Sequence, residues 1–233
     1  MRNIIREYSE IRKCQKKPDG IFTTFLARPL SPAFTWLAVR AGMSPDMVSL
    51  LSFIICTASC VFIFNAATEG SVAAGLLWWL GAVLDSSDGE VARYRQMERP
   101  MGAWLDSFFD RLKEFMVFGT ISAVVFTQAG EMKFLLLGFL AVTSTVMSGI
   151  ITDTGKLMTG ERKPALPLGK NISFHMVDTR DFFVTVALFG GCLPQLLWLY
   201  GTLFPVLVLG QALVFIRRQA RSVTEKGRET AQR

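Results

Sequence analysis

Four aspartates at helical spacing, set between two long apolar runs, most constrain how this chain can fold. Asp88 follows Asp85 by three residues and Asp110 follows Asp106 by four, so each pair lies on one face of an α-helix. A short charged connection that contains Pro100 separates the two pairs. Carboxylates at the edge of a membrane span are costly unless they are paired, bound to metal or facing water. The pattern therefore predicts a helical hairpin whose four carboxylates converge.

The converging carboxylates predict a divalent-metal site. Like charges held close together repel one another and destabilise the hairpin unless cations lie between them. Hard oxygen ligands suit Mg²⁺, Mn²⁺ or Ca²⁺, and one or two such ions would bring a cluster charge of about −4 towards zero. We expect Mg²⁺ or Mn²⁺, with two ions bound, and the predicted ligands are Asp85, Asp88, Asp106 and Asp110.

Eight positions in this stretch resemble the signature of a known enzyme family. They are Asp85, Asp88, Gly89, Ala92, Arg93, Gly102, Asp106 and Asp110. Their spacing is similar to that of the CDP-alcohol phosphotransferases (CDP-alcohol phosphatidyltransferases), and every interval is intact. The resemblance implies a membrane enzyme of phospholipid or phosphodiester synthesis. Such an enzyme transfers a substituted phosphate group from a CDP-alcohol, such as CDP-diacylglycerol, to the hydroxyl of a small polar acceptor and releases CMP.

The resemblance also implies a role for each position. Asp110 lies one helical turn deeper than Asp106 and is the expected general base, with a second role as metal ligand. Arg93 has a planar fork of donors that can pair with Asp88 or contact a phosphate. Small residues let a nucleotide approach the helix backbones closely. The expected nucleotide site consists of Asp88, Gly89, Ala92, Arg93 and Gly102.

Composition and charge-free runs predict an all-α integral membrane protein. The 233 residues are 51% hydrophobic, and the mean hydropathy is +0.36. We expect six transmembrane helices, with the fifth and sixth separated at Gly190, Gly191 and Pro194. An interfacial amphipathic helix, capped at its start by Ser31, should precede them. The expected divisions are a cytoplasmic N-terminus with the interfacial helix (1–42), a six-helix catalytic domain (43–217) and a polar C-terminal tail (218–233).

The distribution of basic residues predicts how the protein sits in the membrane. The net charge of +6 comes from residues beside apolar spans, which favours anionic lipid headgroups rather than nucleic acid as the partner. Lys and Arg concentrate in both termini and in the connections 94–100 and 156–170. We therefore expect both termini and the aspartate hairpin to face the cytoplasm, in the cell inner membrane. A homodimer is common in the family that the chain resembles.

The identity of the acceptor rests on two further features. The N-terminal runs CQKKPDG, ARPLS and SPDMVSLLS are similar to those of family members that use inositol phosphates, including di-inositol-phosphate phosphate synthases. This favours an inositol phosphate, while glycerol phosphate and serine stay open. Arg180 opens the fifth predicted span and Lys156 ends the fourth, so both are expected to bind an anionic acceptor. The alternative for Arg180 is a boundary residue that reaches towards lipid headgroups.

Two other functional classes use clustered carboxylates in a membrane. A membrane prenyltransferase binds a diphosphate through aspartates and Mg²⁺, but it has no need of Gly89, Arg93 and Gly102 at these intervals. A divalent-cation carrier usually places its site near the bilayer midplane on broken helices. The aspartates of this chain instead lie at predicted helix ends beside a charged connection, so the transferase is favoured.

Overall fold

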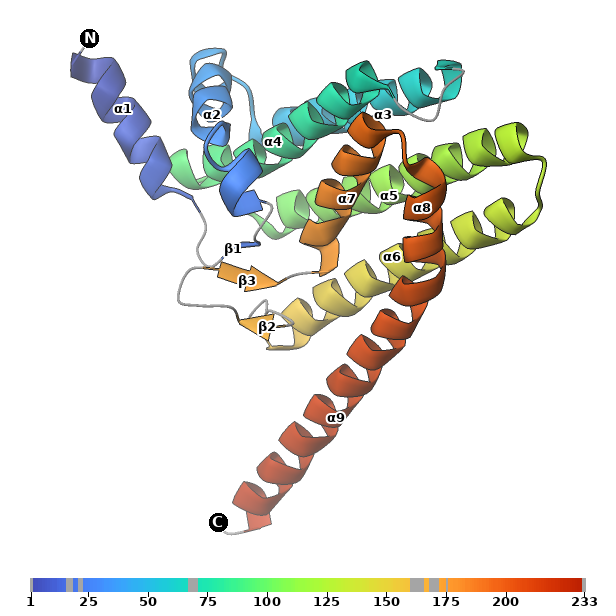
Figure 1. Ribbon diagram of the computed structural model, residues 1–233. Helices are drawn as coiled ribbons and strands as arrows, with labels where there is room; N and C mark the ends of the chain where they lie inside the picture. Colours follow the sequence, from blue (N-terminus) through green and yellow to red (C-terminus); the bar gives the residue numbers. More distant parts are fainter. Residues whose placement is uncertain are drawn as a thin grey trace.

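The computed structural model is built almost entirely of helices (Figure 1). It describes residues 2–15, 19–20, 23–66, 71–159, 166–167, 172–174 and 176–231. The helices are α1 (Arg2–Lys13), η1 (Thr23–Ala27, a π-helix), α2 (Ser31–Arg40), α3 (Pro45–Asn65), α4 (Val72–Tyr94), α5 (Pro100–Ala129), α6 (Lys133–Thr159), α7 (Met176–Gly190), α8 (Leu193–Trp198), η2 (Leu199–Leu203, a π-helix) and α9 (Phe204–Ala231).

Three short strands are the exception to the expected all-α fold. They are β1 (Asp19–Gly20), β2 (Leu166–Pro167) and β3 (Ile172–Phe174). They form one small sheet in the order β1-β3-β2, in which β1 runs parallel and β2 antiparallel to β3. The sheet joins the N-terminal part of the chain to the connection between α6 and α7 (Figure 1).

Helix starts follow the local sequence, with one correction. The Ser44 hydroxyl accepts a hydrogen bond from the Met47 N–H at 3.3 Å and caps α3, which begins at Pro45. Ser31 was expected to cap α2 in the same way, and this is wrong. Leu30 occupies the N-cap position without a side-chain cap bond, and the Ser31 hydroxyl donates to the carboxylate of Glu90 at 2.6 Å. The buried carboxylate orients the Ser31 hydroxyl as a donor to α4, and this hydroxyl accepts no bond from a backbone N–H at the start of α2.

Small residues bring α3 and α4 close together and so position the aspartates. A side chain at Gly81 would collide with the sulfur of Cys56. The hydroxyls of Ser52 and Ser59 donate to the carbonyls of Gly81 and Ala74 at 2.9 and 2.8 Å. Close packing of small and hydroxyl-bearing residues is typical of membrane helices. These contacts hold the N-terminal half of α4 against α3, and the bond from Ser49 to Asp88 continues the packing to the first two aspartates.

Three helical segments are long and apolar enough to cross a membrane. They are Pro45–Asn65, Lys133–Met158 and Leu193–Arg217 within the part of the chain that the structure describes. The helices α4 and α5 carry the charged residues of the motif, and α7 has only 15 residues, shorter than the roughly 20 that span a bilayer. The count of six spans therefore stays a prediction.

Two expectations concern the C-terminal part of the chain, namely a helix break near residue 190 and a polar tail after the last span. The predicted break is confirmed, because α7 ends at Gly190, Gly191 has a left-handed backbone (φ 65°) and Pro194 lies in the first turn of α8. The helix α9 continues through the polar C-terminal tail to Ala231 (Figure 1), and the division of the chain at 218 stays a prediction. The predicted connection 156–170 falls largely outside the described residues.

The N-terminal helices are held together by polar contacts. Glu7 of α1 accepts hydrogen bonds from Trp36 Nε1 at 3.2 Å and from Arg40 Nη2 at 2.9 Å, both on α2. The bond from Arg40 lowers the pKa of Glu7 from its usual value. These contacts attach α1 to α2. The expected placement of an amphipathic helix at the membrane interface stays a prediction.

Candidate active site

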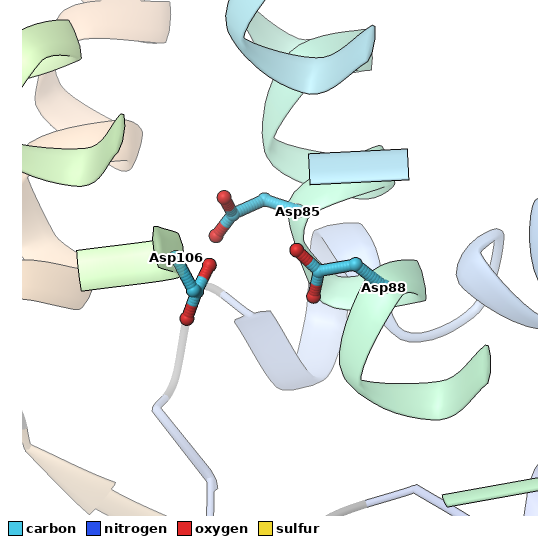
Figure 2. Close-up of side chains that lie close together, drawn as sticks. All are labelled: Asp85, Asp88 and Asp106. Atoms are coloured by element: carbon cyan, nitrogen blue, oxygen red, sulfur yellow. The ribbon is translucent and has the colours of Figure 1, made fainter. Parts of the chain in front are cut away.

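The structure brings the aspartates of α4 and α5 together. Figure 2 shows the carboxylates of Asp85 and Asp88, from α4, pointing towards that of Asp106, from α5. One oxygen from each of these three residues lies within 4.8 Å of the other two. Asp110 does not belong to this group of three, although it lies one turn further along α5. The helical hairpin that the spacing predicts is therefore present.

A single cavity of about 340 Å³ contains every residue that the sequence assigns to the site. The ten predicted residues along its wall are Asp85, Asp88, Gly89, Ala92, Arg93, Gly102, Asp106, Asp110, Lys156 and Arg180. The sequence analysis did not assign the other charged and hydroxyl groups along the wall, among them Arg28, Asp46, Ser49, Arg99, Asp153 and Asp181. Arg28, Ser49 and Asp153 come from segments far from the motif, so only the fold places them at the site, whereas Arg99 lies within the motif stretch and Asp181 directly follows Arg180.

The three clustered carboxylates fit a divalent metal ion. Their ligand atoms are all oxygens, the type that Mg²⁺ and Mn²⁺ prefer. Asp88 is also fixed from behind, because it accepts a hydrogen bond from the Ser49 hydroxyl at 2.5 Å and another from the Gly89 N–H. Such supporting bonds orient a carboxylate towards its metal. The residues present therefore match the cofactor that the sequence predicts.

A buried lysine lies between two of the aspartates of the site, Asp85 and Asp110. The side chain of Lys113 is only 4% exposed, and its Nζ atom lies 2.5 Å from Asp85 and 2.9 Å from Asp110. The pair with Asp110 is local, at i,i+3 on α5, and the sequence suggests it. The pair with Asp85 joins α5 to α4 across the site. The protein thus supplies a cation of its own between two of the four aspartates.

Arg180 belongs to a second charged network in the same cavity. It is 3% exposed and donates from Nη1 to Glu114 at 2.7 Å, and from Nε and Nη2 to Asp181 at 3.0 and 3.2 Å. Its Nη2 atom lies 3.9 Å from Asp110. Arg111 also pairs with Glu114, at 3.0 Å. A buried charge needs such partners, so the expectation that Arg180 only marks the lipid boundary does not describe its surroundings.

The small residues of the motif leave room beside two arginines. A side chain added at Gly89 would come within 3.2 Å of the Arg93 guanidinium, and one at Gly102 within 3.5 Å of Arg99. Arg93 donates from Nε to the carbonyl of Cys14 at 2.5 Å. Among the described residues, no ion pair joins Arg93 to Asp88, so the first of its two expected roles is not seen.

Comparison with known protein families identifies the chain. The family described as CDP-alcohol phosphatidyltransferase matches residues 42–209. The chain belongs to this family. Its members are transferases, so the expected enzyme class is confirmed, and the alternatives of a prenyltransferase and a cation carrier are not supported.

Individual relatives agree with the family assignment. An uncharacterized protein of Aquifex aeolicus is 33% identical over 106 residues, which is 46% of this chain and 52% of that protein. Proteins named bifunctional IPC transferase and DIPP synthase, from Aquifex aeolicus and Archaeoglobus fulgidus, are 28% and 27% identical over 59% and 54% of this chain. The matched region spans about half of the first relative and only 30% and 25% of the two bifunctional proteins.

A solved structure has a similar fold. The crystal structure of Mycobacterium tuberculosis phosphatidylinositol phosphate synthase with CDP-DAG bound superimposes with a TM-score of 0.58 at 17% identity. The superposition covers 78% of this chain and 93% of that one. At this identity the likeness concerns the fold, and it agrees with the family match.

Proposed function

We propose that the protein transfers a substituted phosphate group from a CDP-lipid, such as CDP-diacylglycerol, to a hydroxyl of an inositol phosphate and releases CMP. The observation that carries this proposal is the single cavity in which the three clustered carboxylates and Arg180 lie together. The names of the bifunctional relatives and the CDP-DAG bound to the mycobacterial enzyme support the same substrate classes. Glycerol phosphate and serine are the alternative acceptors.

The four aspartates of the motif have distinct roles in the proposed reaction. Asp85, Asp88 and Asp106 would hold Mg²⁺ or Mn²⁺, with two ions proposed, and the bound metal supplies neutralisation of the phosphate charge. Asp110 accepts the proton of the acceptor hydroxyl. The acceptor oxygen then forms a bond to phosphorus while the bond between phosphorus and the CMP oxygen breaks. Asp110 is also retained as a candidate ligand of the second ion.

The nucleotide part of the site is proposed on the other motif positions. Gly89, Ala92 and Gly102 carry little or no side chain, so phosphates and cytidine can approach the helix backbones there. Arg93 lies over Gly89 and presents a guanidinium to the same space. A guanidinium binds phosphate oxygens through parallel hydrogen bonds, which suits the pyrophosphate of a CDP-alcohol.

An acceptor panel tests the proposed function. The measurement is CMP release from CDP-diacylglycerol in nanodiscs containing Mg²⁺, with inositol phosphate, inositol, glycerol phosphate or serine as acceptor. We expect the highest kcat/KM with inositol phosphate, because Arg180 and Lys156 suit a phosphorylated acceptor and the names of the relatives favour inositol over glycerol. Highest activity with serine would make the inositol-phosphate assignment wrong. Absence of CMP release with every acceptor and CDP-lipid would contradict the transferase itself.

Arg180 and Lys156 are the proposed acceptor-binding residues. Three of the Arg180 N–H groups are engaged by Glu114 and Asp181, and a guanidinium carries five. Lys156 is exposed and lines the cavity from α6. We expect Arg180→Ala to raise the acceptor KM about ten- to a hundredfold, which is the effect of losing one charge-assisted phosphate contact, with little change in the CDP-lipid KM. Lys156→Ala should act in the same direction.

Two further variants control this experiment. Arg180→Lys keeps a cation beside Glu114 and Asp181, so it separates loss of the acceptor contact from loss of a buried ion pair. Lys133→Ala removes an exposed lysine at the other end of α6 and should leave the acceptor KM unchanged. An unchanged acceptor KM in both Arg180→Ala and Lys156→Ala would remove these residues from the acceptor site.

The proposal includes the location and assembly of the protein. We place it in the cell inner membrane with both termini and the active site facing the cytoplasm, and we propose a homodimer. The apolar helices and the membrane enzyme family support a membrane protein. The family match over 42–209 supports a catalytic domain close to the expected 43–217, preceded by the N-terminal division 1–42 and followed by the tail 218–233.

Labelling of single cysteines tests the orientation. Glu98 lies between α4 and α5 and Glu131 lies between α5 and α6, and both are exposed. In a variant without the native cysteines, we expect Glu98→Cys to react with an impermeant thiol reagent only from the cytoplasmic side. Glu131→Cys should react only from the opposite side, because the 30 residues of α5 separate the two positions. Labelling of both from one side would contradict the six-span arrangement.

A further inference from the structure

The cavity has a wall that precedes the region matched by the family. The match begins at residue 42, yet Gly20, Thr23 and Arg28 line the same cavity as the aspartates. Figure 1 shows this N-terminal part of the chain beside α4, and η1 and α2 both contact α4. We name as the N-terminal wall six residues of this part: Thr23 and Arg28, which line the cavity, and Cys14, Gln15, Ser31 and Thr35, which lie behind them.

A fully buried carboxylate fixes this wall to α4. Glu90 is 0% exposed and follows Gly89 of the motif directly. Its oxygens accept hydrogen bonds from four side chains of the wall, which are Arg28 at 2.7 Å, Ser31 at 2.6 Å, Thr35 at 2.7 Å and Gln15 at 3.3 Å. A buried carboxylate is costly unless it is paired and hydrogen-bonded. The four donors meet that requirement.

Other contacts join the wall to residues between the motif positions. Arg28 Nη1 donates to the carbonyl of Ser86 at 3.4 Å, and the Ser87 hydroxyl donates to the carbonyl of Ser31 at 3.3 Å. Arg93, itself a motif residue, donates to the carbonyl of Cys14. The wall is therefore attached along α4 from Ser86 to Arg93, the stretch that also contains Asp88 and Gly89.

We propose that the N-terminal wall completes the site for the CDP part of the donor, with Arg28 contacting its phosphates. This inference rests on the proposed function. Arg28 lines the cavity and donates a hydrogen bond to the carbonyl of Ser86. In the sequence, Ser86 lies between the candidate metal ligands Asp85 and Asp88. Its planar guanidinium suits a pyrophosphate. The proposed acceptor residues, by contrast, come from α6 and α7. Glu90 is a positioning residue that acts through Arg28.

Direct binding of the donor tests the role of Arg28. The measurement is the Kd of CDP-diacylglycerol for the purified full chain in nanodiscs, with the acceptor KM measured beside it. We expect Arg28→Ala to weaken donor binding about tenfold or more and to leave the acceptor KM within about twofold of wild type. Arg28→Lys keeps a positive charge and should recover part of the loss. The matched control Arg40→Ala removes an arginine that pairs with Glu7 away from the cavity, and it should bind the donor normally.

The role of Glu90 is tested by a double-mutant cycle. Glu90→Gln keeps the shape of the side chain but removes the charge that holds Arg28, so donor binding should weaken while the kcat at saturating donor changes less. If Glu90 acts through Arg28, adding Glu90→Gln to Arg28→Ala should weaken binding no further. If the wall were purely structural, the substitutions would instead raise the donor Kd and the acceptor KM by similar factors. That result, or wild-type donor binding in Arg28→Ala, would overturn the inference.

The binding measurement also separates this inference from the proposed function. If the chain binds CDP-diacylglycerol through Arg28 but transfers nothing to inositol phosphate, the role of the N-terminal wall is supported and the acceptor assignment is wrong. If the Arg28→Ala variant releases CMP at the wild-type rate at low donor concentration, the proposed function is supported and the role of the N-terminal wall is contradicted. A chain with no affinity for CDP-diacylglycerol would contradict both.

Discussion

Replacing any one of Asp85, Asp88 and Asp106 by asparagine is expected to lower Mg²⁺-dependent CMP release by at least about a hundredfold, because charge stabilisation at the reacting phosphate depends on the metal. Asparagine keeps the shape of the side chain and removes the negative charge that an oxygen-ligated divalent ion needs. One oxygen from each of the three carboxylates lies within 4.8 Å of the other two, so each substitution removes one of the proposed ligand charges. The measurement is the initial rate of CMP release over a range of Mg²⁺ concentrations.

Two other aspartates distinguish a metal site from a general loss of charge. Asp153 lines the same cavity but lies outside the group of three, so Asp153→Asn should leave the Mg²⁺ concentration for half-maximal rate unchanged. Asp110→Asn should lose turnover while donor binding is largely kept, as expected of a base. Wild-type rates in two of the three clustered variants would refute the metal site. Equal loss of donor affinity in Asp110→Asn would make Asp110 a ligand rather than a base.

The sequence predicts those features of the site that depend on a single helix or a single turn. Asp85 and Asp88 share a helical face because an α-helix repeats every 3.6 residues, and the same holds for Asp106 and Asp110. The start of α3 follows from Ser44 and Pro45, whose preferences are also local. The short charged connection that contains Pro100 adds the pairing of the two helices, because two adjacent helices joined by so short a segment form a hairpin.

The remaining parts depend on contacts between distant segments. Lys113 reads as a local partner of Asp110, and only the packing of α5 on α4 shows that it also reaches Asp85, 28 residues away. Glu90 occupies a position that the eight-residue motif leaves unspecified, so nothing near it in the sequence indicates that Arg28 and Ser31 would bind it. The expected cap at Ser31 is wrong for the same reason, since a carboxylate from a distant segment orients the hydroxyl that would otherwise accept from a local N–H.

The second large effect is expected at Lys113. Lys113→Met keeps most of the apolar volume but leaves the carboxylates of Asp85 and Asp110 without the cation that lies 2.5 and 2.9 Å from them. Removing one partner of a buried ion pair costs about 3–5 kcal/mol. We therefore expect the purified variant to unfold at a clearly lower temperature than wild type in the absence of divalent ions. Lys133→Met, which removes an exposed lysine paired with Glu131, is the matched control and should unfold like wild type.

Divalent cations should reverse part of this loss, because they can neutralise the same carboxylates. A ligand that binds only the folded state stabilises it by about 2.7 kcal/mol at a concentration of 100 times its Kd. Without Lys113 the cluster is more negative, so it should bind Mg²⁺ or Mn²⁺ more tightly, and the rise in unfolding temperature on adding the ion should exceed that of wild type. Monovalent salt at equal ionic strength should have a smaller effect, because buried pairs are screened less than exposed ones. If the ion shifts both proteins equally, Lys113 does not share its carboxylates with the metal site, and its role is limited to joining α4 to α5.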